Sequence, residues 1–426
     1  MINARKLAVG ILVKIESGGA YSNLTLASYF KDVEISREDK SFVSALVYGV
    51  LDRKITLDYV LSKFLKTPLK KTAPFTLNVL RTALYQIMFM DKIPESAAVN
   101  EAVKIIKKSK ENRNAPFVNA VLRNVLRADE LLPDGDAPND LSVKYSAPLW
   151  LVEVFIDDYG NTTAIRLLEE SLKPAPFTLK VNTLKISKDS LIEKLSNEGV
   201  EAKHGNIENS IILEKGIDLA NNKFFKEGLF YAEDEASQTA ISVLKPKPYE
   251  KVLDICAAPG GKTFTMAAYM ENKGEIIACD LYEHRVKLIE NGAERLGIDI
   301  IKTKTCDATI YDECLGEFDV ILCDVPCSGL GVIRRKPDIK YKQNEDFKEL
   351  EKIQYSILCN AVKYLKKGGR IMYSTCTLRR AENEELVNSF LKEYNSFKKV
   401  TEKTLMPHID KTDGFYYCLL EEASFE

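Results

Sequence analysis

Through the first 128 or so residues, apolar positions recur three and four apart, the spacing that predicts amphipathic helices. In the segment 5–15, Leu7, Ile11 and Ile15 lie along one stripe. Ser36 precedes a charged turn and is expected to cap a helix over residues 42–51. No strand-like alternation interrupts this region, so we predict an all-helical bundle. Further helices are expected at residues 74–90, 96–109 and 115–128.

The stretch LLPDGDAPND, residues 131–140, has the composition of a turn-rich linker and predicts a domain boundary. Beyond it, residues 177–184 alternate like a strand, 188–199 have a helical pattern, and 209–216 form a second strand-like run. We therefore expect a small α+β module. The predicted domains are an all-helical domain over 1–130, the small α+β module over 141–235 and a third domain over 236–426.

From residue 251 onward, apolar strands alternate with helical patterns, which predicts βαβ units and a mainly parallel sheet with helices on both faces, a Rossmann-like α/β fold. The final run FYYCLLE, residues 415–421, is expected to add an antiparallel edge strand. The predicted strands are 251–256, 274–280, 301–307, 318–324 and 369–375, and the predicted helices follow residue 261 and cover 284–297 and 351–368.

Composition is typical of a globular protein, with 45% hydrophobic residues and no apolar run long enough to cross a membrane. The N-terminus lacks the features of a signal peptide, so the cytoplasm is the expected compartment. All nine cysteines follow position 250, without a CxxC pair, and there are three histidines. Neither a disulfide framework nor a metal site is expected.

Positive charge is concentrated in one segment. Residues 53–127 carry fifteen Lys or Arg against five Asp or Glu, a balance of +10 in a chain of net charge −2. A charge run alone is most simply a set of solvated helix faces, but this asymmetry also fits a localised phosphate-facing surface.

Directly after the first strand of the third domain comes CAAPGGKT, residues 256–263. Small residues and paired glycines let a ligand approach the backbone, and the following helix offers its N-terminus. A phosphate-binding loop of the Walker A type needs a glycine five residues before Gly261, where this chain has Cys256, and a GxGxxG pattern is absent. Nucleotide hydrolysis and dinucleotide binding are therefore disfavoured.

Three successive strands end in aspartate, at Asp280, Asp307 and Asp324. A single acidic strand end usually caps a turn. Three at adjoining carboxyl edges suggest hydrogen-bond acceptors for ribose hydroxyls and an exocyclic amine.

Two cysteines follow strand ends. Cys327 lies in DVPCSG, residues 324–329, where the proline fixes a turn, and Cys376 lies in YSTCT, residues 373–377. Either thiol is compatible with packing or with chemistry on these grounds. The basic run at 334–336 suggests contacts with nucleic acid phosphates.

The motifs CAAPGGKT, DVPCSG and YSTCT, in this order on these strands, resemble those of the RNA cytosine-C5 methyltransferases that use S-adenosyl-L-methionine. The resemblance extends upstream through LKVNTLK, residues 179–185, and AEDEASQ, residues 232–238. The helical N-terminal region looks like the NusB-type RNA-binding bundle. Together they resemble the bacterial Sun or Fmu subgroup, which methylates 16S ribosomal RNA.

This resemblance implies that the cofactor is lined by the glycine turn, that Asp280 binds its ribose and that Asp307 lies near its adenine. It implies that Cys376 attacks carbon 6 of the cytosine, that Cys327 assists product release and that Asp324, which is also expected to bind the cofactor, approaches the reaction centre. That position would allow Asp324 to assist at N3 of the base. The implied residues of the turn are Cys256, Ala257, Ala258, Pro259, Gly260, Gly261 and Lys262.

The expected partner is 16S rRNA, free or in an early small-subunit particle, with neither membrane nor metal. The same chemistry on transfer RNA, or a non-catalytic RNA-binding assembly factor on the same fold, are the alternatives. Both cysteines and all three aspartates are present, which disfavours the second of these.

Overall fold

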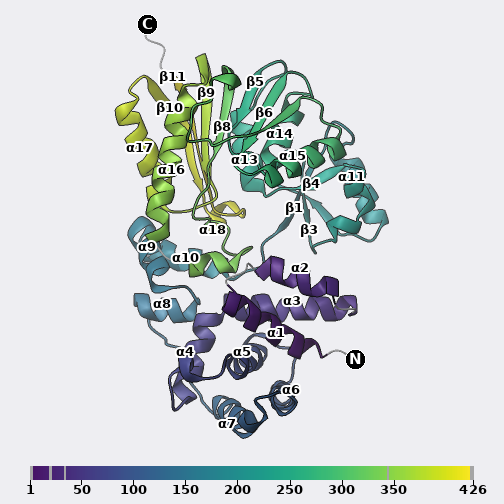
Figure 1. Cartoon of the computed structure of the whole chain (residues 1–426), viewed down its shortest axis with the longest axis vertical. Helices are drawn as coiled ribbons and strands as arrows, with labels where there is room; N and C mark the ends of the chain where they lie inside the picture. The colour runs from purple at the N-terminus through teal and green to yellow at the C-terminus, as the bar shows by residue number, and fades with distance from the viewer. Residues whose placement is uncertain (1–2, 19–21, 33–34, 343–344, 423–426) are drawn as a thin grey trace. The chain divides into compact units, whose positions relative to one another are not determined.

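The computed structural model describes residues 3–18, 22–32, 35–342 and 345–422 (Figure 1). Two compact units make up the chain, one of Met1–Leu172 with Lys336–Lys342 and the other of Lys173–Arg335 with Gln343–Glu426. Within the described ranges, no helix is both long enough and apolar enough to cross a membrane.

The first unit is helical throughout its described residues, as predicted. Ser36 caps α3 as expected, because its side chain accepts a hydrogen bond of 3.0 Å from the Asp39 amide. The helices are α1 (Ala4–Gly18), α2 (Ser22–Asp32), α3 (Arg37–Asp52), α4 (Lys54–Phe64), α5 (Pro74–Phe89), α6 (Glu95–Lys107), α7 (Ala115–Val125), α8 (Pro138–Lys144), α9 (Leu149–Tyr159) and α10 (Asn161–Ser171).

Apolar faces of α1 and α3 to α7 form one core in this unit, and a buried arginine ties three of these helices together. Arg81 of α5 donates to both oxygens of Asp58 in α4, at 2.6 and 2.8 Å, and to Glu16 in α1 at 2.7 Å. A bidentate pair of this kind fixes direction as well as distance, so it specifies how these helices cross.

A segment from much later in the sequence completes the helical unit. Lys340, on the short 3-10 helix Pro337–Tyr341, has a side chain only 1% exposed, and its Nζ lies 2.9 Å from Asp52 Oδ1 and 2.6 Å from the Asp52 carbonyl oxygen. The Tyr341 hydroxyl donates to the Leu51 carbonyl oxygen at 2.7 Å. Burial lowers the pKa of Lys340, which the Asp52 carboxylate opposes.

The second unit begins with a small antiparallel sheet in the order β2-β3-β1-β4. Leu179 and Val181 of β1 pack with Leu191 and Leu195 of α11 in a core of their own, as expected for an α+β module. Its elements are β1 (Phe177–Val181), α11 (Lys188–Asn197), β2 (Ala202–His204), β3 (Ser210–Leu213), α12 (Lys223–Lys226) and β4 (Phe230–Ala232).

A seven-stranded sheet in the order β10-β11-β9-β8-β5-β6-β7 dominates the second unit. Strands β9, β8, β5, β6 and β7 run parallel, which confirms the predicted Rossmann-like fold. The strands are β5 (Lys251–Asp254), β6 (Glu275–Asp280), β7 (Ile301–Thr305), β8 (Phe318–Asp324), β9 (Leu365–Thr375), β10 (Phe397–Leu405) and β11 (Phe415–Glu422), and the helices are α13 (Glu235–Leu244), α14 (Gly261–Tyr269), α15 (Glu283–Leu296), α16 (Glu345–Val362), α17 (Glu384–Glu393) and α18 (Pro407–Asp410).

The last predicted strand, β11, is antiparallel but does not lie at the edge, so that expectation was wrong. It pairs with β9 on one side and with β10 on the other. Strand β10 was missed because its sequence, FKKVTEKTL, is mostly polar and half of its residues face solvent. Lysines on an edge strand discourage pairing with other chains, and β7 at the opposite edge, IKTKT, has the same character.

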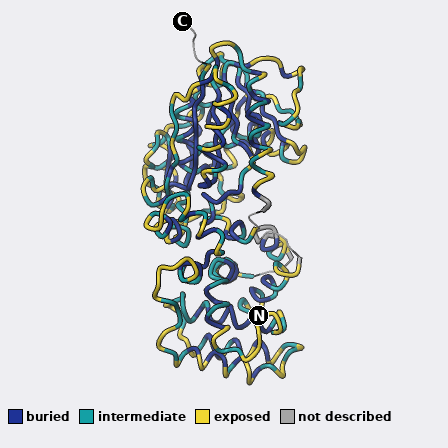
Figure 2. Tube along the Cα trace, turned by 90° about the vertical axis from the view of Figure 1, so that its left-hand side faces the viewer, coloured by how far each residue is buried: buried dark blue, intermediate teal, exposed yellow. Residues whose placement is uncertain are grey.

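Helices cover both faces of this sheet, α13 to α15 on one and α16 and α17 on the other (Figure 1). Successive residues of β8 point to opposite faces, so Val320 and Leu322 join one core and Ile321 and Cys323 the other. Because both faces are covered, the strands appear as mostly buried traces in Figure 2.

Replacing Lys340 with alanine should lower the free energy of unfolding of the helical unit by about 3 kcal/mol, because it leaves the partly buried Asp52 carboxylate without its partner. Urea denaturation followed by circular dichroism measures this. Lys342→Ala, on the exposed end of the same segment, is the control and should change stability by less than about 0.5 kcal/mol. Equal changes in the free energy of unfolding for the two substitutions would contradict a stabilising role for the Lys340–Asp52 pair.

Candidate active site

The turn between β5 and α14 is built from backbone contacts. The Ala257 amide donates to the Cys279 carbonyl oxygen at 2.7 Å, and the Gly260 amide donates to the Ala257 carbonyl oxygen at 2.8 Å. Gly260 has φ of +109°, and a Cβ there would lie 2.4 Å from the Phe264 ring, so only glycine fits. Burial raises the pKa of Cys256 well above its usual value, which makes that thiol a packing group rather than a nucleophile.

Asp280, at the end of β6, is 3% exposed and faces the same turn. Its Oδ2 accepts a hydrogen bond of 3.3 Å from the Ala258 amide and lies 3.2 Å from Nη1 of Arg285. Arg285 also donates to the Ala258 carbonyl oxygen at 2.8 Å. This arginine, which the sequence did not single out, therefore orients both the aspartate and the turn.

Asp307, after β7, is exposed and lines a cavity of about 570 Å³ together with Cys306, Ile310 and Tyr311. Its Oδ1 accepts hydrogen bonds from the Thr309 hydroxyl at 2.6 Å and the Thr309 amide at 2.9 Å. These bonds lower the pKa of Asp307, so the carboxylate form is favoured.

Asp324, at the end of β8, forms an ion pair with Lys262 of α14. Asp324 Oδ2 lies 2.9 Å from Lys262 Nζ, and Oδ1 accepts from the Ser374 hydroxyl at 2.9 Å. Burial acts to lower the pKa of Lys262, but the carboxylates of Asp324 and Glu233 outweigh it and raise that pKa above its usual value. Lys262 is thus a fixed positive charge, and it also lies 5.2 Å from the centre of the Phe415 ring.

The two candidate cysteines meet at the adjoining ends of β8 and β9. Cys327 Sγ and Cys376 Sγ are 3.1 Å apart. Their hydrogen bond, together with burial and the nearby carboxylates of Glu382 and Asp324, raises the pKa of Cys327 well above its usual value. Cys327 is therefore held as a thiol that can donate to the sulfur of Cys376. The Cys376 sulfur lies close enough to Lys262 that a charge on it would add to the effects that raise the pKa of Lys262.

The predictions from sequence did not include two buried carboxylates beside the glycine turn. Asp254, 1% exposed, accepts from the Thr263 hydroxyl at 2.6 Å, and Glu233, 8% exposed, accepts from the Thr265 hydroxyl at 2.6 Å. The second oxygen of each carboxylate has no hydrogen-bond partner among the described residues. Asp254 also lies at the end of a strand, in KVLDIC. The pattern that identified the other three aspartates could therefore have identified this one as well.

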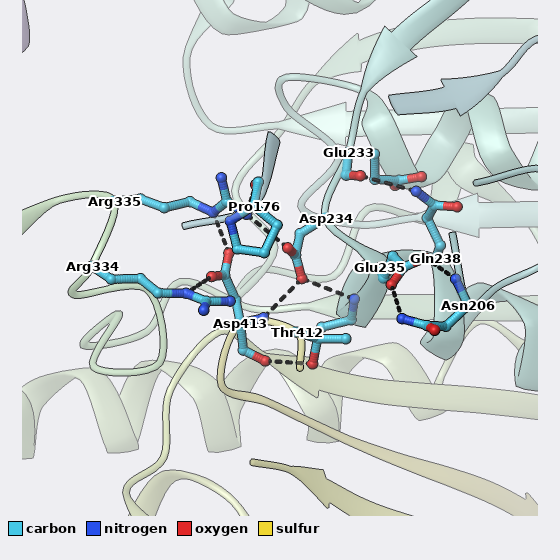
Figure 3. Close-up of polar contacts among 11 residues, drawn as sticks. Pro176, Asn206, Glu233, Asp234, Glu235, Gln238, Arg334, Arg335, Thr412 and Asp413 are labelled. Atoms are coloured by element: carbon cyan, nitrogen blue, oxygen red, sulfur yellow. Dashed lines mark hydrogen bonds and ion pairs between the residues drawn. The ribbon is translucent and has the colours of Figure 1, made fainter. Parts of the chain in front are cut away.

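Glu233, Asp234 and Glu235 are consecutive and each faces a different element (Figure 3). Glu233 bonds to α14 as described, Asp234 Oδ1 accepts from the Asp413 amide at 3.1 Å, and Glu235 Oε1 accepts from the Asn206 amide at 2.6 Å. We call these three residues the acidic hub. It joins the small sheet, the glycine-turn helix and the segment before β11.

The basic run at 334–336 does not serve as predicted. Arg334 Nε lies 2.7 Å from Asp413 Oδ1 and its side chain is 5% exposed. Arg335 pairs with the other Asp413 oxygen and, at 2.8 Å, with Asp234 (Figure 3). Both guanidinium groups are engaged inside the unit, so the expectation that they bind phosphates was wrong.

The Cys327–Cys376 and Asp324–Lys262 pairs lie at the adjoining ends of β8 and β9, where Ser374 also bonds to Asp324. Asp280 contacts the turn at Ala258. Asp307 lies after β7, at the far edge of the sheet from the cysteines. The order of these groups therefore follows the order of the strands, from the two neighbouring thiols through the glycine turn to the exposed carboxylate.

Three family models match the chain. They are described as 16S rRNA methyltransferase RsmB/F, over residues 241–421, the NusB family, over 2–127, and an RsmF/B-like ferredoxin-like domain, over 147–220.

Among curated proteins, the chain is 40% identical to the probable ribosomal RNA small subunit methyltransferase B of Bacillus subtilis, with 99% of each chain covered. It is 31% identical to the ribosomal RNA small subunit methyltransferase B of Shewanella oneidensis, with 99% of this chain and 100% of that one covered. Among solved structures, the crystal structure of PH0851 matches with a TM-score of 0.83 and 26% identity, covering 99% of each chain.

Asp254 should make stability depend on pH. Burial raises its pKa to about 7, with the charge of Asp324 adding to the effect and the Thr263 hydrogen bond opposing it. The folded chain therefore holds a proton that the unfolded chain releases near pH 4. The resulting stabilisation is complete below about pH 4 and is lost as the pH rises to about 7.

Between pH 5 and pH 7 this loss should amount to about 2 kcal/mol for the intact protein without cofactor. Asp254→Asn keeps an acceptor for the Thr263 hydroxyl and removes the titration, so the variant should gain stability relative to the wild type over that interval. Urea denaturation at pH 5, 6, 7 and 8 measures the difference. If the free energy of unfolding changed with pH in the same way in both proteins, Asp254 would not be the source of this pH dependence.

Proposed function

Since the chain belongs to the 16S rRNA methyltransferase RsmB/F family, we propose that it methylates carbon 5 of a cytosine in 16S ribosomal RNA with S-adenosyl-L-methionine as the methyl donor. The observation that carries this proposal is the contact of 3.1 Å between the Cys327 and Cys376 sulfurs, beside the Lys262–Asp324 ion pair. C5 chemistry on cytosine needs a nucleophile that adds to carbon 6, and a second thiol in contact with the first is well placed to act on the adduct.

The residues beside the turn suit the cofactor. The backbone of 256–262 offers close approach, and Asp280 and Asp307 offer carboxylate acceptors for hydroxyl and amine groups. When bound, S-adenosylmethionine supplies an electrophilic methyl group on a sulfonium.

Cys376 is the proposed nucleophile. Its sulfur forms a bond to carbon 6 of the base, and the electron pair of the C5–C6 double bond becomes available on carbon 5, which takes the methyl group. Transfer of the carbon 5 proton to a base, for which water suffices, then returns the C–H electron pair to the ring, and the C6–S bond breaks to release Cys376 as a thiolate. The positive charge of Lys262 and the thiol of Cys327 both favour the thiolate form that this attack needs.

Lys262 and Asp324 are proposed to hold the base. The edge of cytosine presents an amine donor beside a ring nitrogen and a carbonyl oxygen, and an ammonium next to a carboxylate complements that pattern. Lys262 keeps its positive charge, so its ammonium can donate a hydrogen bond to an acceptor on the edge of the base during the addition.

Cys327 is proposed to assist the release of product. It touches the Cys376 sulfur and is held protonated, so after methyl transfer its S–H is available to the departing thiolate. This role differs from nucleophilic attack, and the two cysteines can be separated by mutation.

RNA selection is proposed to fall to the helical domain over 1–130 and the module over 141–235, with catalysis in 236–426. The basic segment of the helical domain presents its positive side chains to solvent, as phosphate contacts require. The exposed basic residues are Lys63, Lys66, Lys70, Lys71, Lys92, Lys104, Lys107, Lys108, Lys110, Arg113, Arg123 and Arg127. A single-stranded or remodelled RNA region is the expected substrate, because the base must leave its stack.

Cys376→Ala should reduce methyl transfer by at least about a thousandfold, because it removes the atom that forms the covalent bond. It should also abolish trapping on RNA that contains 5-fluorocytosine. Cys327→Ala should instead form an adduct with ordinary RNA that persists in denaturing gels. Retained methylation by Cys376→Ala, or persistent adducts formed by it, would exclude the proposed division of labour.

Transfer of labelled methyl groups to bulk 16S rRNA and to bulk tRNA tests the substrate. We expect incorporation into rRNA only, and bisulfite mapping of 16S rRNA from a deletion strain should show the loss of one cytosine-C5 mark. Persistence of every such mark would contradict the rRNA assignment, incorporation into tRNA would favour the tRNA enzyme, and none into either would favour a non-catalytic factor.

A further inference from the structure

Glu382 and Asn383 are adjacent residues, and both are completely buried where the short 3-10 helix Arg380–Glu382 runs into α17. Burying a polar side chain destabilises the folded state unless the side chain is hydrogen bonded. The partners of these two residues are the turns that carry the two cysteines.

Asn383 holds the turn of Cys376 from both sides. The Thr375 hydroxyl donates to Asn383 Oδ1 at 2.6 Å, and Asn383 Nδ2 donates to the Thr377 carbonyl oxygen at 3.1 Å. The residues immediately before and after Cys376 are therefore fixed by one side chain.

Glu382 holds the turn of Cys327 in the same manner. Its Oε2 accepts from the Ser328 amide at 2.9 Å and from Gln354 Nε2 at 2.8 Å. Gln354 Nε2 also donates to the Pro326 carbonyl oxygen at 2.9 Å, so the residues on both sides of Cys327 are fixed. Arg379 lies 3.3 Å from Glu382 Oε1 and offsets its charge.

A hydrogen bond of 2.7 Å between the hydroxyls of Ser328 and Thr377 joins the two turns directly. Because consecutive Cα atoms are about 3.8 Å apart, side chains on neighbouring residues can keep two turns in contact with little freedom. The short distance between the sulfurs thus follows from the pairing of Glu382 with one turn and Asn383 with the next.

We propose that Glu382 and Asn383 are positioning residues for separate steps of the reaction, Asn383 for the attack of Cys376 and Glu382 for the release step that uses Cys327. The inference rests on the proposed function and adds residues to it. A merely structural role for the pair would impair both steps alike, whereas separate positioning impairs one step in each variant.

The test compares two rates in the full-length protein, adduct formation on 5-fluorocytosine RNA and turnover on ordinary 16S rRNA. Asn383→Ala should slow both by about 10- to 100-fold, the usual cost of misplacing a reacting group by about 1 Å, without accumulating adduct. Glu382→Ala should form the adduct on 5-fluorocytosine RNA at a rate within about threefold of the wild-type rate. Its turnover on ordinary RNA should be about 10- to 100-fold slower, and adduct should accumulate there.

Conservative and milder variants guard against loss of folding. Glu382→Gln retains an acceptor for the Ser328 amide and should recover most of the turnover. Thr375→Val removes one bond to Asn383, and Gln354→Met removes the bonds to Glu382 and Pro326. These two should reproduce, more weakly, the separate defects expected of the alanine variants.

Matched controls come from the acidic hub and the small module. Glu235 accepts from backbone amides at 2% exposure, and Asn182 donates to two backbone carbonyl oxygens at 2% exposure. Glu235→Gln and Asn182→Ala should change trapping and turnover by the same factor, with no adduct on ordinary RNA.

If Glu382→Ala lost trapping and turnover by the same factor and accumulated no adduct, as expected of Asn383→Ala, the inference would be overturned and the proposed function would stand. Failure of the wild type to trap on 5-fluorocytosine RNA would overturn the proposed function and this inference with it.

Discussion

Parallel strands place their carboxyl ends along one edge of a sheet, and the chemistry of this protein depends on that constraint. Five parallel strands, in the order β9-β8-β5-β6-β7, bring together groups that are more than one hundred residues apart in sequence. The order has a chemical meaning, because thiols lie after β9 and β8, the glycine turn after β5, and carboxylates after β6 and β7. Methyl donor and methyl acceptor would then occupy neighbouring stretches of one edge.

Buried charge is the second organising principle of the unit that carries the sheet. Lys262, the acidic hub and the Arg334 and Arg335 pairs are removed from water at considerable cost, and each is matched by partners from other elements. Such pairs add little net stability but penalise any arrangement that separates them. The second unit therefore gains specificity of arrangement from charges that solvent would otherwise screen.

The fold, and the strand ends that carry the candidate residues, could be predicted from sequence because their signals are local. Short sequence windows are enough to recognise the alternating strands and helices, the glycine turn and the aspartate at each strand end. The structure has the predicted fold. The positions of the proposed site residues were predicted in the same way, although their roles stay proposals.

Other features depend on partners far away in sequence, and no local pattern predicts them. Glu382 contacts Ser328, 54 residues earlier, and Lys340 contacts Asp52, 288 residues earlier. Arg334 and Arg335 have the same composition as a phosphate-binding run, and only their acidic partners distinguish the two roles. Strand β10 was missed because an edge strand can be polar on both faces.

The late segment Lys336–Lys342 has a consequence for synthesis on the ribosome. The helical unit is complete only when residue 342 has been made, 170 residues after residue 172, where its continuous part ends. At about 5 to 20 residues per second the delay is roughly 10 to 30 s. During that interval Asp52 has no Lys340 beside it, and the carbonyl oxygens of Leu51 and Asp52 lack the donors that later cover them. The first unit to emerge thus receives its final contacts only after residues 173–335 of the second unit have been made, and a chain that stalls or ends before residue 340 would leave this part of its surface unfilled.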